Sequence, residues 1–116
     1  VCYTGTHDND TTVGWFHGAD SDIRSEEDIR KNQKYALQAT DGTPESIHLD
    51  MISLAFSSEA KLTIAPMQDY LGLGSEARLN IPGTTSGNWR WRVSRDQLSS
   101  EFCESIAQLV EEMSRN

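Results

Sequence analysis

The sequence predicts an α/β fold in which strands and helices alternate along the chain. Two short apolar runs, 1–6 and 62–65, have the composition of strands; the first is rich in β-branched and aromatic residues. Two helical segments lie between these runs, and a third follows them after a long loop. This order is typical of parallel βα units.

Two βα units are too few to close a barrel, and two strands alone do not make a stable sheet. The chain also opens at Val1, already within the first strand pattern and without an initiator Met. We therefore expect the 116 residues to be a piece of a longer protein, cut just before or inside a strand.

A polar connection joins the first strand to the first helix. The strand over 1–6 ends at Gly5-Thr6, and a dense polar run over 7–12 follows it. Residues 13–16 come next, and residues 18–22 are predicted to be a loop.

Two helices are predicted before the second strand. Ser25 is a suitable N-cap for a helix over about 25–39, because acidic residues follow it near the positive end of the helix dipole. Thr43-Pro44 is expected to start the second helix, with Thr43 as N-cap and Pro44 at the first helical position. One apolar face of this second helix consists of Ile47, Met51, Leu54 and Ala55.

The rest of the chain contains the second strand, a long loop and the last helix. The strand over 62–65 is expected to be buried and to end at Pro66. Residues 67–91 show little periodicity, and the Trp and Leu residues of this loop argue against disorder. Asp96 is expected to cap the last helix. The apolar stripe of that helix consists of Leu98, Phe102, Ile106, Leu109, Val110 and Met113.

Charge and cysteine content exclude several classes of partner. Lys+Arg number 10 against Asp+Glu 18, for a formal net charge of -8. Nucleic acid or an anionic membrane would need clustered basic residues, so we expect neither as a partner. No stretch approaches the roughly 20 apolar residues that span a bilayer. Cys2 and Cys103 suggest neither a disulfide framework nor a metal site, so reduced thiols in a cytoplasmic setting are expected.

The polar run after the first strand is the first candidate for chemistry. His7 and Asp8 lie where a strand ends and a helical connection begins, which is the edge that carries active sites in βα barrels. A carboxylate beside an imidazole can bind sugar hydroxyls, because the first accepts hydrogen bonds and the second donates or accepts one. Asp and Asn are also common N-caps, and spacing alone favours capping over catalysis.

Two later segments hold further polar and aromatic candidates. Gln68 and Asp69 follow the second strand and could face a ligand, although spacing alone favours Asp69 as the cap of a short turn. Asn80 carries an amide suited to sugar hydroxyls. Trp89 and Trp91 share one face if their segment is extended, and they could stack on sugar rings, although packing in a core is the commoner role of Trp.

Three remaining side chains are expected to have no chemical role. His17 and His48 have no partner in register and are predicted to be ordinary surface or boundary residues. Cys103 falls inside the pattern of the last helix and is expected to be packed.

Taken together, these segments resemble the amylomaltase family of 4-alpha-glucanotransferases, also called disproportionating enzymes, of the alpha-amylase clan. The stretches that carry the resemblance are Tyr3-Thr4-Gly5-Thr6-His7-Asp8-Asn9-Asp10-Thr11, Pro66-Met67-Gln68-Asp69, Leu71-Gly72-Leu73-Gly74, Arg78 with Asn80, Pro82-Gly83-Thr84, and Gly87-Asn88-Trp89-Arg90-Trp91-Arg92. They occur in the order and approximate spacing of the family, and only their combination is specific.

The resemblance implies the last two strand–helix units of a (β/α)8 TIM barrel, with 1–6 as its seventh strand and 62–65 as its eighth. Residues 1–116 would be the C-terminal portion of the catalytic barrel domain, because a complete barrel needs about 250 residues. The implied reaction moves an α-1,4-glucan segment to the 4-hydroxyl of an acceptor glucan or glucose, with retention at C1. The implied substrates are maltooligosaccharides and starch or glycogen dextrins, in the cytoplasm or, in a plant, the plastid.

The resemblance also implies roles for single residues. Retaining transfer needs a nucleophilic carboxylate and a carboxylic acid about 5 Å apart, and in the family both lie on earlier strands that this chain lacks. Asp8 matches a third, catalytic carboxylate, which binds hydroxyls of the sugar being cleaved and favours its oxocarbenium-like ring. His7 and Asn80 match substrate-binding residues. Nothing in the sequence indicates a metal or an organic cofactor.

Two other functions remain open at this stage. An α-glucan hydrolase of the same clan would use the third carboxylate in the same way, although Gln68-Asp69 and residues 80–83 favour the transferase. A non-catalytic carbohydrate-binding module is disfavoured by the two-strand sheet and by the start within a strand. We expect the 116 residues alone to be inactive and poorly folded, because the apolar helix faces have no barrel to cover.

Overall fold

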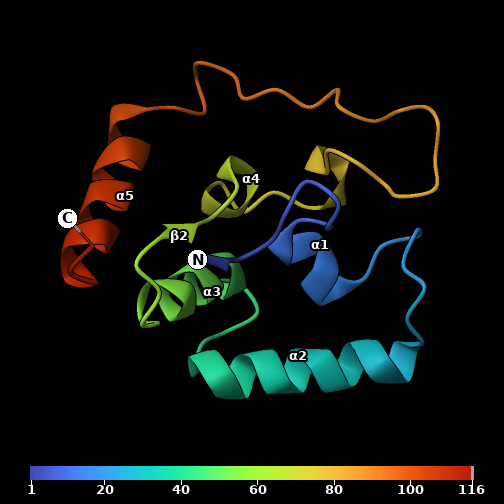
Figure 1. The fold of residues 1–116 in the computed structure, drawn as a ribbon, viewed down its shortest axis with the longest axis horizontal. Helices are drawn as coiled ribbons and strands as arrows, with labels where there is room; N and C mark the ends of the chain where they lie inside the picture. Colours follow the sequence, from blue (N-terminus) through green and yellow to red (C-terminus); the bar gives the residue numbers. More distant parts are fainter. Residues whose placement is uncertain (116) are drawn as a thin grey trace.

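The structure is a computed structural model that describes residues 1–115, in which helices surround a short parallel sheet (Figure 1). Strand β1 (Cys2–Tyr3) pairs in parallel with β2 (Thr63–Ile64). In this register Cys2 lies opposite Thr63, and Tyr3 lies opposite Ile64. The predicted α/β pattern with a parallel strand pair is therefore confirmed, with hydrogen-bonded strands shorter than the apolar runs.

Helices form the crossover between the strands and the segment that follows β2. The crossover contains α1 (Thr12–His17), α2 (Glu26–Thr40) and α3 (Ile47–Phe56). After β2 come α4 (Met67–Tyr70), a 3-10 turn η1 (Ser75–Ala77) and α5 (Ser100–Glu112). Figure 1 shows α3 between the sheet and α2, with α5 at one edge of the molecule.

The hydrophobic core lies between the three crossover helices. Phe16 of α1, Ala36 of α2 and Ile47 of α3 are buried together, and partly buried apolar side chains surround them. This burial provides most of the favourable free energy that fixes α1. The polar run immediately before α1 is therefore attached to a well-packed element.

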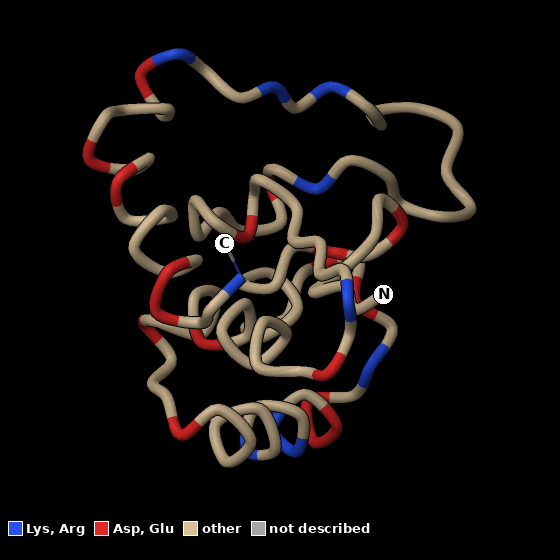
Figure 2. The backbone as a smooth tube through the Cα atoms, turned by 60° about the vertical axis from the view of Figure 1, so that its left-hand side comes forward, with Lys and Arg blue, Asp and Glu red and all other residues tan. Residues whose placement is uncertain are grey.

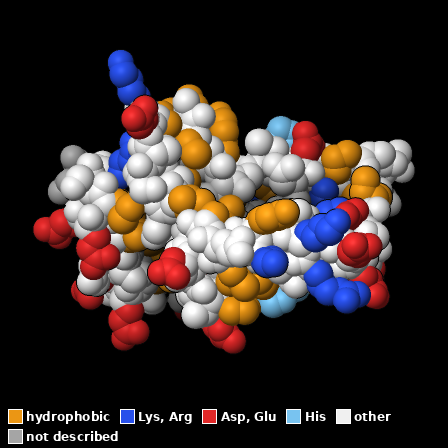
Figure 3. Space-filling model, turned by 90° about the horizontal axis from the view of Figure 1, so that it is seen from below, with side chains coloured by type: hydrophobic (Ala, Val, Ile, Leu, Met, Phe, Trp, Pro, Cys, Tyr) orange, Lys and Arg blue, Asp and Glu red, His pale blue; other side chains and the backbone are white. Residues whose placement is uncertain are grey.

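One face of the sheet is apolar and exposed. Because side chains alternate along a strand, Val1 and Tyr3 share a face, and their neighbours Leu62 and Ile64 continue it. All four side chains are exposed in the structure, which contradicts the predicted burial of the second strand. Figure 3 shows further hydrophobic side chains at the surface among charged ones.

We expect the isolated 116-residue chain to be only weakly cooperative when it unfolds. Its bare sheet face and its exposed apolar side chains on the helices leave a small buried core. A thermal scan followed by near-UV circular dichroism should show a broad, shallow change, and a dye that binds apolar surface should fluoresce before heating. A sharp cooperative transition would contradict this expectation.

Helix α1 was not predicted from the sequence. Thr11 caps it, and the Thr11 Oγ1 atom accepts a hydrogen bond from Gly14 N at 3.1 Å. Six residues with a central glycine are too short to display helical periodicity. Within the polar run over 7–12, the residue that caps a helix is therefore Thr11.

The predicted start of α2 is confirmed, and that of α3 is wrong. Ser25 caps α2 through a 3.1 Å hydrogen bond from Asp28 N. Helix α3 begins at Ile47, because Thr43–Ser46 forms a separate turn in which Ser46 N donates to Thr43 O at 3.2 Å. The Asp50 carboxylate stabilises this turn by accepting a 2.6 Å hydrogen bond from Ser46 Oγ.

Two predictions about α5 are also corrected. Ser99 caps this helix instead of Asp96, through a 3.1 Å hydrogen bond from Phe102 N to Ser99 Oγ. Cys103 is exposed instead of packed. Within the helix that stripe is half-buried, whereas Leu98 precedes the helix and is exposed.

Charged residues are spread over most elements. Figure 2 shows acidic residues on α2 and α5 and several basic ones along the loop before α5. That loop contains Arg90, Arg92 and Arg95, all of them exposed. Within residues 1–115, no helix combines the length and the apolar composition needed to cross a membrane.

Candidate functional site

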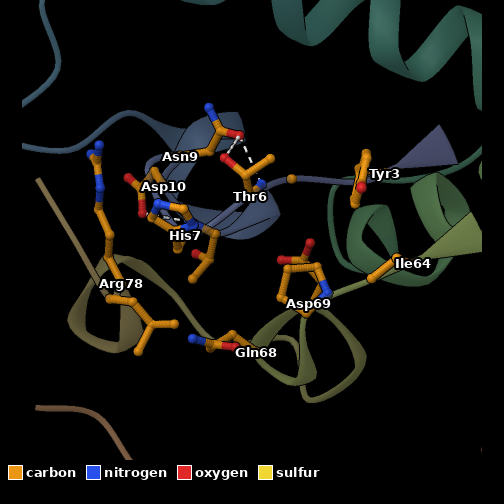
Figure 4. A pocket seen from close by; sticks show the side chains of 13 residues that line it. Tyr3, Thr6, His7, Asn9, Asp10, Ile64, Gln68, Asp69 and Arg78 are labelled. Carbon is orange, nitrogen blue, oxygen red and sulfur yellow. Dashed lines mark hydrogen bonds between the residues drawn. The ribbon is translucent and has the colours of Figure 1, made fainter. Parts of the chain in front are cut away.

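The loops that follow β1 and β2 enclose an open pocket. Its volume is about 430 Å³. Figure 4 shows side chains of the first loop, those of Thr6, His7, Asn9 and Asp10, facing the same space as Gln68, Asp69 and Arg78 of the second. Tyr3 and Ile64, from the exposed sheet face, form one end of the pocket. The pocket therefore lies at the carboxyl ends of the parallel strands, which is where α/β folds place ligands.

The structure brings together the three residues singled out in the sequence. Asn80 Nδ2 donates a 2.7 Å hydrogen bond to Asp8 Oδ1, although the two residues are 72 positions apart. His7 Nε2 lies 3.3 Å from Asp8 Oδ2. The side chains of His7 and Asp8 remain 56% and 51% exposed. The Asp8 carboxylate therefore keeps acceptor positions that a polar ligand can reach.

A tight turn presents His7 and Asp8 at its tip. Asn9 Oδ1 accepts hydrogen bonds from Thr6 N at 2.8 Å and from Thr6 Oγ1 at 3.0 Å. Asn9 N in turn donates to Thr6 O at 3.1 Å. Asn9 stabilises its own turn in this way, as Asn commonly does. Asp8 caps no helix, and its carboxylate is available to Asn80 and to a ligand.

Asp69 is a buried junction between the two loops. It lines the pocket, as one interpretation of the sequence expected, and it does not cap the short turn of α4 as the other expected. Its side chain is 2% exposed. Asp69 Oδ2 accepts from Thr4 Oγ1 at 2.7 Å, and Asp69 Oδ1 accepts from Thr12 N at 2.8 Å. The carboxylate thus links α4 to the end of β1 and to the start of α1. The preceding Gln68 is also buried and donates from Nε2 to Ala77 O at 3.1 Å.

Asp10 makes a second link between the loops. Asp10 Oδ2 accepts from Ser75 Oγ at 2.7 Å, and Asp10 Oδ1 accepts from Thr11 N at 2.7 Å. Gly14 packs directly against this pair. The sequence did not indicate either junction, because the partners are far apart along the chain. Thr4 and Thr12 lie more than fifty residues from Asp69, and Ser75 lies 65 residues from Asp10.

Gly14→Ala is expected to destabilise the complete protein by about 1–3 kcal/mol. An added Cβ would lie 2.5 Å from Asp10 Oδ1 and closer still to Ser75 Oγ, so the Asp10–Ser75 contact must open. This cost exceeds the helix propensity of Ala, which gains about 1 kcal/mol over Gly. Urea unfolding of the complete protein measures the change. Gly5→Ala is the matched control, because its added Cβ would meet nothing nearer than 3.7 Å; equal stability of both variants would contradict this account.

Trp89 is held against His7 by a closed loop. The two ring centroids are 5.2 Å apart, with an interplanar angle of 37°. Trp89 N donates to Leu79 O at 2.6 Å, and Trp89 adopts a left-handed φ of 60°. The segment is therefore not uniformly extended, and the condition under which Trp89 and Trp91 would share one face is not met. Trp89 is exposed, whereas Trp91 is half-buried.

Arg24 fixes the loop between α1 and α2. Its Nη2 atom donates to Trp15 O at 2.6 Å, and its guanidinium lies 5.4 Å from the centroid of the Trp15 ring. Hydrogen bonds from Arg24 hold the pKa of the Asp22 carboxyl below its usual value. This loop borders a second hollow of about 380 Å³, which Asp8 also lines.

His17 is exposed and His48 is half-buried, which confirms the prediction of surface or boundary positions. The buried Nδ1 atom of His48 has no hydrogen-bond partner within residues 1–115, and its ring abuts Gly72. Burial lowers the pKa of His48 below its usual value of 6.5. The unfolded chain then binds the proton more readily, so this burial reduces stability as the pH falls below about 6.5.

Comparisons with known proteins agree on one family. The sequence profile of the family described as 4-alpha-glucanotransferase matches residues 1–98. The 4-alpha-glucanotransferase of Synechocystis sp. is 49% identical over 111 residues, which cover 96% of this chain and 20% of that protein. The chloroplastic/amyloplastic 4-alpha-glucanotransferase of Arabidopsis thaliana is 46% identical over 105 residues, which cover 87% of this chain and 17% of that protein.

A solved structure shares the fold of the chain. The amylomaltase from Streptococcus agalactiae, in complex with acarbose, superposes with a TM-score of 0.80 at 27% identity. The match covers 97% of this chain and 21% of that chain. The 116 residues thus span about a fifth of the length of the relatives they match. Since the family profile covers most of the sequence, this chain belongs to the 4-alpha-glucanotransferase family, glycoside hydrolase family 77.

Proposed function

We propose that these residues form part of the active site of a 4-alpha-glucanotransferase. The observation that carries the proposal is the cluster of Asp8, His7 and Asn80 at the carboxyl ends of two parallel strands. In the proposed reaction, an α-1,4-glucan segment is transferred to the 4-hydroxyl of an acceptor glucan or glucose, with retention at C1. Family membership supports this reaction. Because the chain spans about a fifth of the length of its relatives, most of the catalytic machinery would lie outside it.

Asp8 is the proposed catalytic residue of this chain. Its carboxylate would accept hydrogen bonds from hydroxyls of the sugar undergoing cleavage. As positive charge develops on the ring, the hydroxyls become better donors, so these bonds strengthen in the transition state and lower the barrier. His7 and Asn80 are proposed to bind the same sugar. The contact from Asn80 holds the Asp8 carboxylate in place before the sugar arrives.

We propose that β1 and β2 are the seventh and eighth strands of a (β/α)8 barrel, of which residues 1–116 form the C-terminal portion. The bare apolar face of Val1, Tyr3, Leu62 and Ile64 supports this placement. The interior of such a barrel is filled by large branched and apolar side chains from every strand. The remaining strands of the complete protein would cover this face.

The proposed substrates are α-1,4-glucans such as maltooligosaccharides and dextrins of starch or glycogen. The amylomaltase that shares the fold was solved with acarbose bound, and the open polar rim of the pocket suits the hydroxyls of such a ligand. The proposed location is the cytoplasm, or a plastid if the source is a plant.

Maltotriose is the substrate that tests the proposed reaction in the complete protein. A transferase converts it into glucose and longer maltooligosaccharides, which chromatography of the products separates. A hydrolase of the same clan would release glucose and maltose without longer products. A carbohydrate-binding module would leave maltotriose unchanged, and either of these two outcomes would overturn the proposal.

A further inference from the structure

We infer that Arg78 is a positioning residue that sets the Asp8 carboxylate for its sugar; this inference rests on the proposed function. Arg78 follows η1 in the second loop, 70 residues beyond Asp8. It belongs to a motif that carries the family resemblance, but no role for it follows from the sequence alone. The structure places its guanidinium between the backbones of Asp8 and Asn80, and Arg78 lines both the pocket and the hollow that Asp8 borders.

The guanidinium of Arg78 bridges two backbone carbonyls. Its Nη2 atom donates to Asp8 O at 2.8 Å, and its Nε atom donates to Asn80 O at 2.8 Å. A guanidinium is planar, and its donors have a fixed spacing, so two such bonds define both the distance and the angle between the segments. Arg78 therefore fixes the backbone of Asp8 relative to the backbone of Asn80.

The side chains close the same arrangement from the other end. Asn80 Nδ2 donates to Asp8 Oδ1 at 2.7 Å. Three hydrogen bonds therefore connect Arg78, Asp8 and Asn80 in a closed network: Arg78 to the backbone of each, and Asn80 to the side chain of Asp8. Without Arg78, the Asn80–Asp8 contact would be the remaining link of this network, and the exposed tip of the first loop could shift.

The contacts of Arg78 indicate a geometric role. Among residues 1–115, Arg78 forms no salt bridge with a carboxylate. Its two hydrogen bonds to carbonyl oxygens leave the oxygens of the Asp8 carboxylate to Asn80 and to a ligand. Because misplacement of a catalytic group by about 1 Å can cost about a hundredfold in rate, the alignment of Asp8 is the property that Arg78 would control.

The test compares Arg78→Ala and Arg78→Lys with wild type in the complete protein. Lysine keeps the positive charge but has a single ammonium group, which does not reproduce the two N–H donors of the guanidinium at their fixed spacing. We expect both variants to lower kcat for maltotriose disproportionation by about ten- to a hundredfold, with KM within about twofold because ground-state contacts of His7 and Asn80 remain. Added guanidinium at millimolar concentration should restore part of the kcat of Arg78→Ala and should leave the kcat of wild type unchanged.

Arg115 provides a matched control. Its guanidinium also donates only to backbone carbonyls, those of Phe56, Ser58 and Ala60, in the turn before β2. Arg115→Ala removes a comparable set of bonds at a site distant in sequence from Asp8. We expect this variant to lower the thermal midpoint and to leave kcat unchanged, with no response to guanidinium.

The outcomes separate this inference from the proposed function. If Arg78→Ala and Arg78→Lys keep kcat within about twofold of wild type while Asp8→Asn is inactive, the inference is wrong and the proposed function stands. If Asp8→Asn remains fully active, the proposed catalytic role of Asp8 fails, and this inference fails with it. If Arg78→Ala does not fold, Arg78→Lys decides: a folded variant with normal kcat would overturn the inference, and a lowered kcat at an unchanged thermal midpoint would support it.

Discussion

Asp8→Asn in the complete protein is expected to lower kcat for glucan transfer by at least about a hundredfold. Removal of a single preorganised group that acts on developing charge typically costs about a hundred- to a thousandfold. The amide keeps the size of the carboxylate and one acceptor oxygen, so the contact from Asn80 can persist. What is lost is the negative charge that favours the oxocarbenium-like sugar.

The same substitution is expected to leave the fold intact. The Asp8 side chain is 51% exposed, so its replacement leaves no buried charge without a partner. Thermal unfolding should therefore coincide with that of wild type. Asp20→Asn, at an exposed loop position, is the control for loss of a charge and should retain full kcat. Normal turnover in Asp8→Asn would remove Asp8 from the catalytic assignment.

Asp69→Ala is expected to have the largest effect on stability. The substitution leaves Thr12 N without its acceptor in a buried environment and Thr4 Oγ1 without its acceptor in a partly buried one. Each buried donor without a partner costs about 1–3 kcal/mol, so the free energy of unfolding should fall by about 2–6 kcal/mol. The urea midpoint of the complete protein, followed by tryptophan fluorescence, measures this loss.

Two further variants define the origin of that loss. Asp69→Asn keeps one acceptor oxygen and should fall between Asp69→Ala and wild type. Asp20→Ala removes an exposed carboxylate and should change stability by less than about 0.5 kcal/mol. If Asp69→Ala matched Asp20→Ala, the buried junction between the loops would have no energetic importance.

The parts of the fold that could be predicted are those encoded locally. The strand runs and the Ser25 cap depend on neighbouring residues, and the structure confirms them. Helix α1 could not be predicted because its six residues are too few to show a helical repeat of apolar positions. The starts of α3 and α5 were misplaced because several suitable caps occur in succession, and longer-range contacts such as that of Asp50 decide between them.

The candidate site was predictable only as separate motifs. Sequence patterns identified His7, Asp8 and Asn80, but proximity across 72 residues depends on tertiary structure. The roles of Asp69, Asp10 and Arg78 were missed for the same reason, since their partners lie on the other loop. Their local signal was weak, because a carboxylate after a strand is equally typical of a turn.

The most direct test of the account is a crystal structure of the complete protein with acarbose bound. We predict that one sugar-like ring lies within hydrogen-bond distance of the Asp8 carboxylate and His7, beside Asn80, at the carboxyl ends of β1 and β2. Arg78 should keep its bonds to the carbonyls of Asp8 and Asn80 in that complex. A ligand bound elsewhere, with Asp8 making no contact to it, would contradict the central claim.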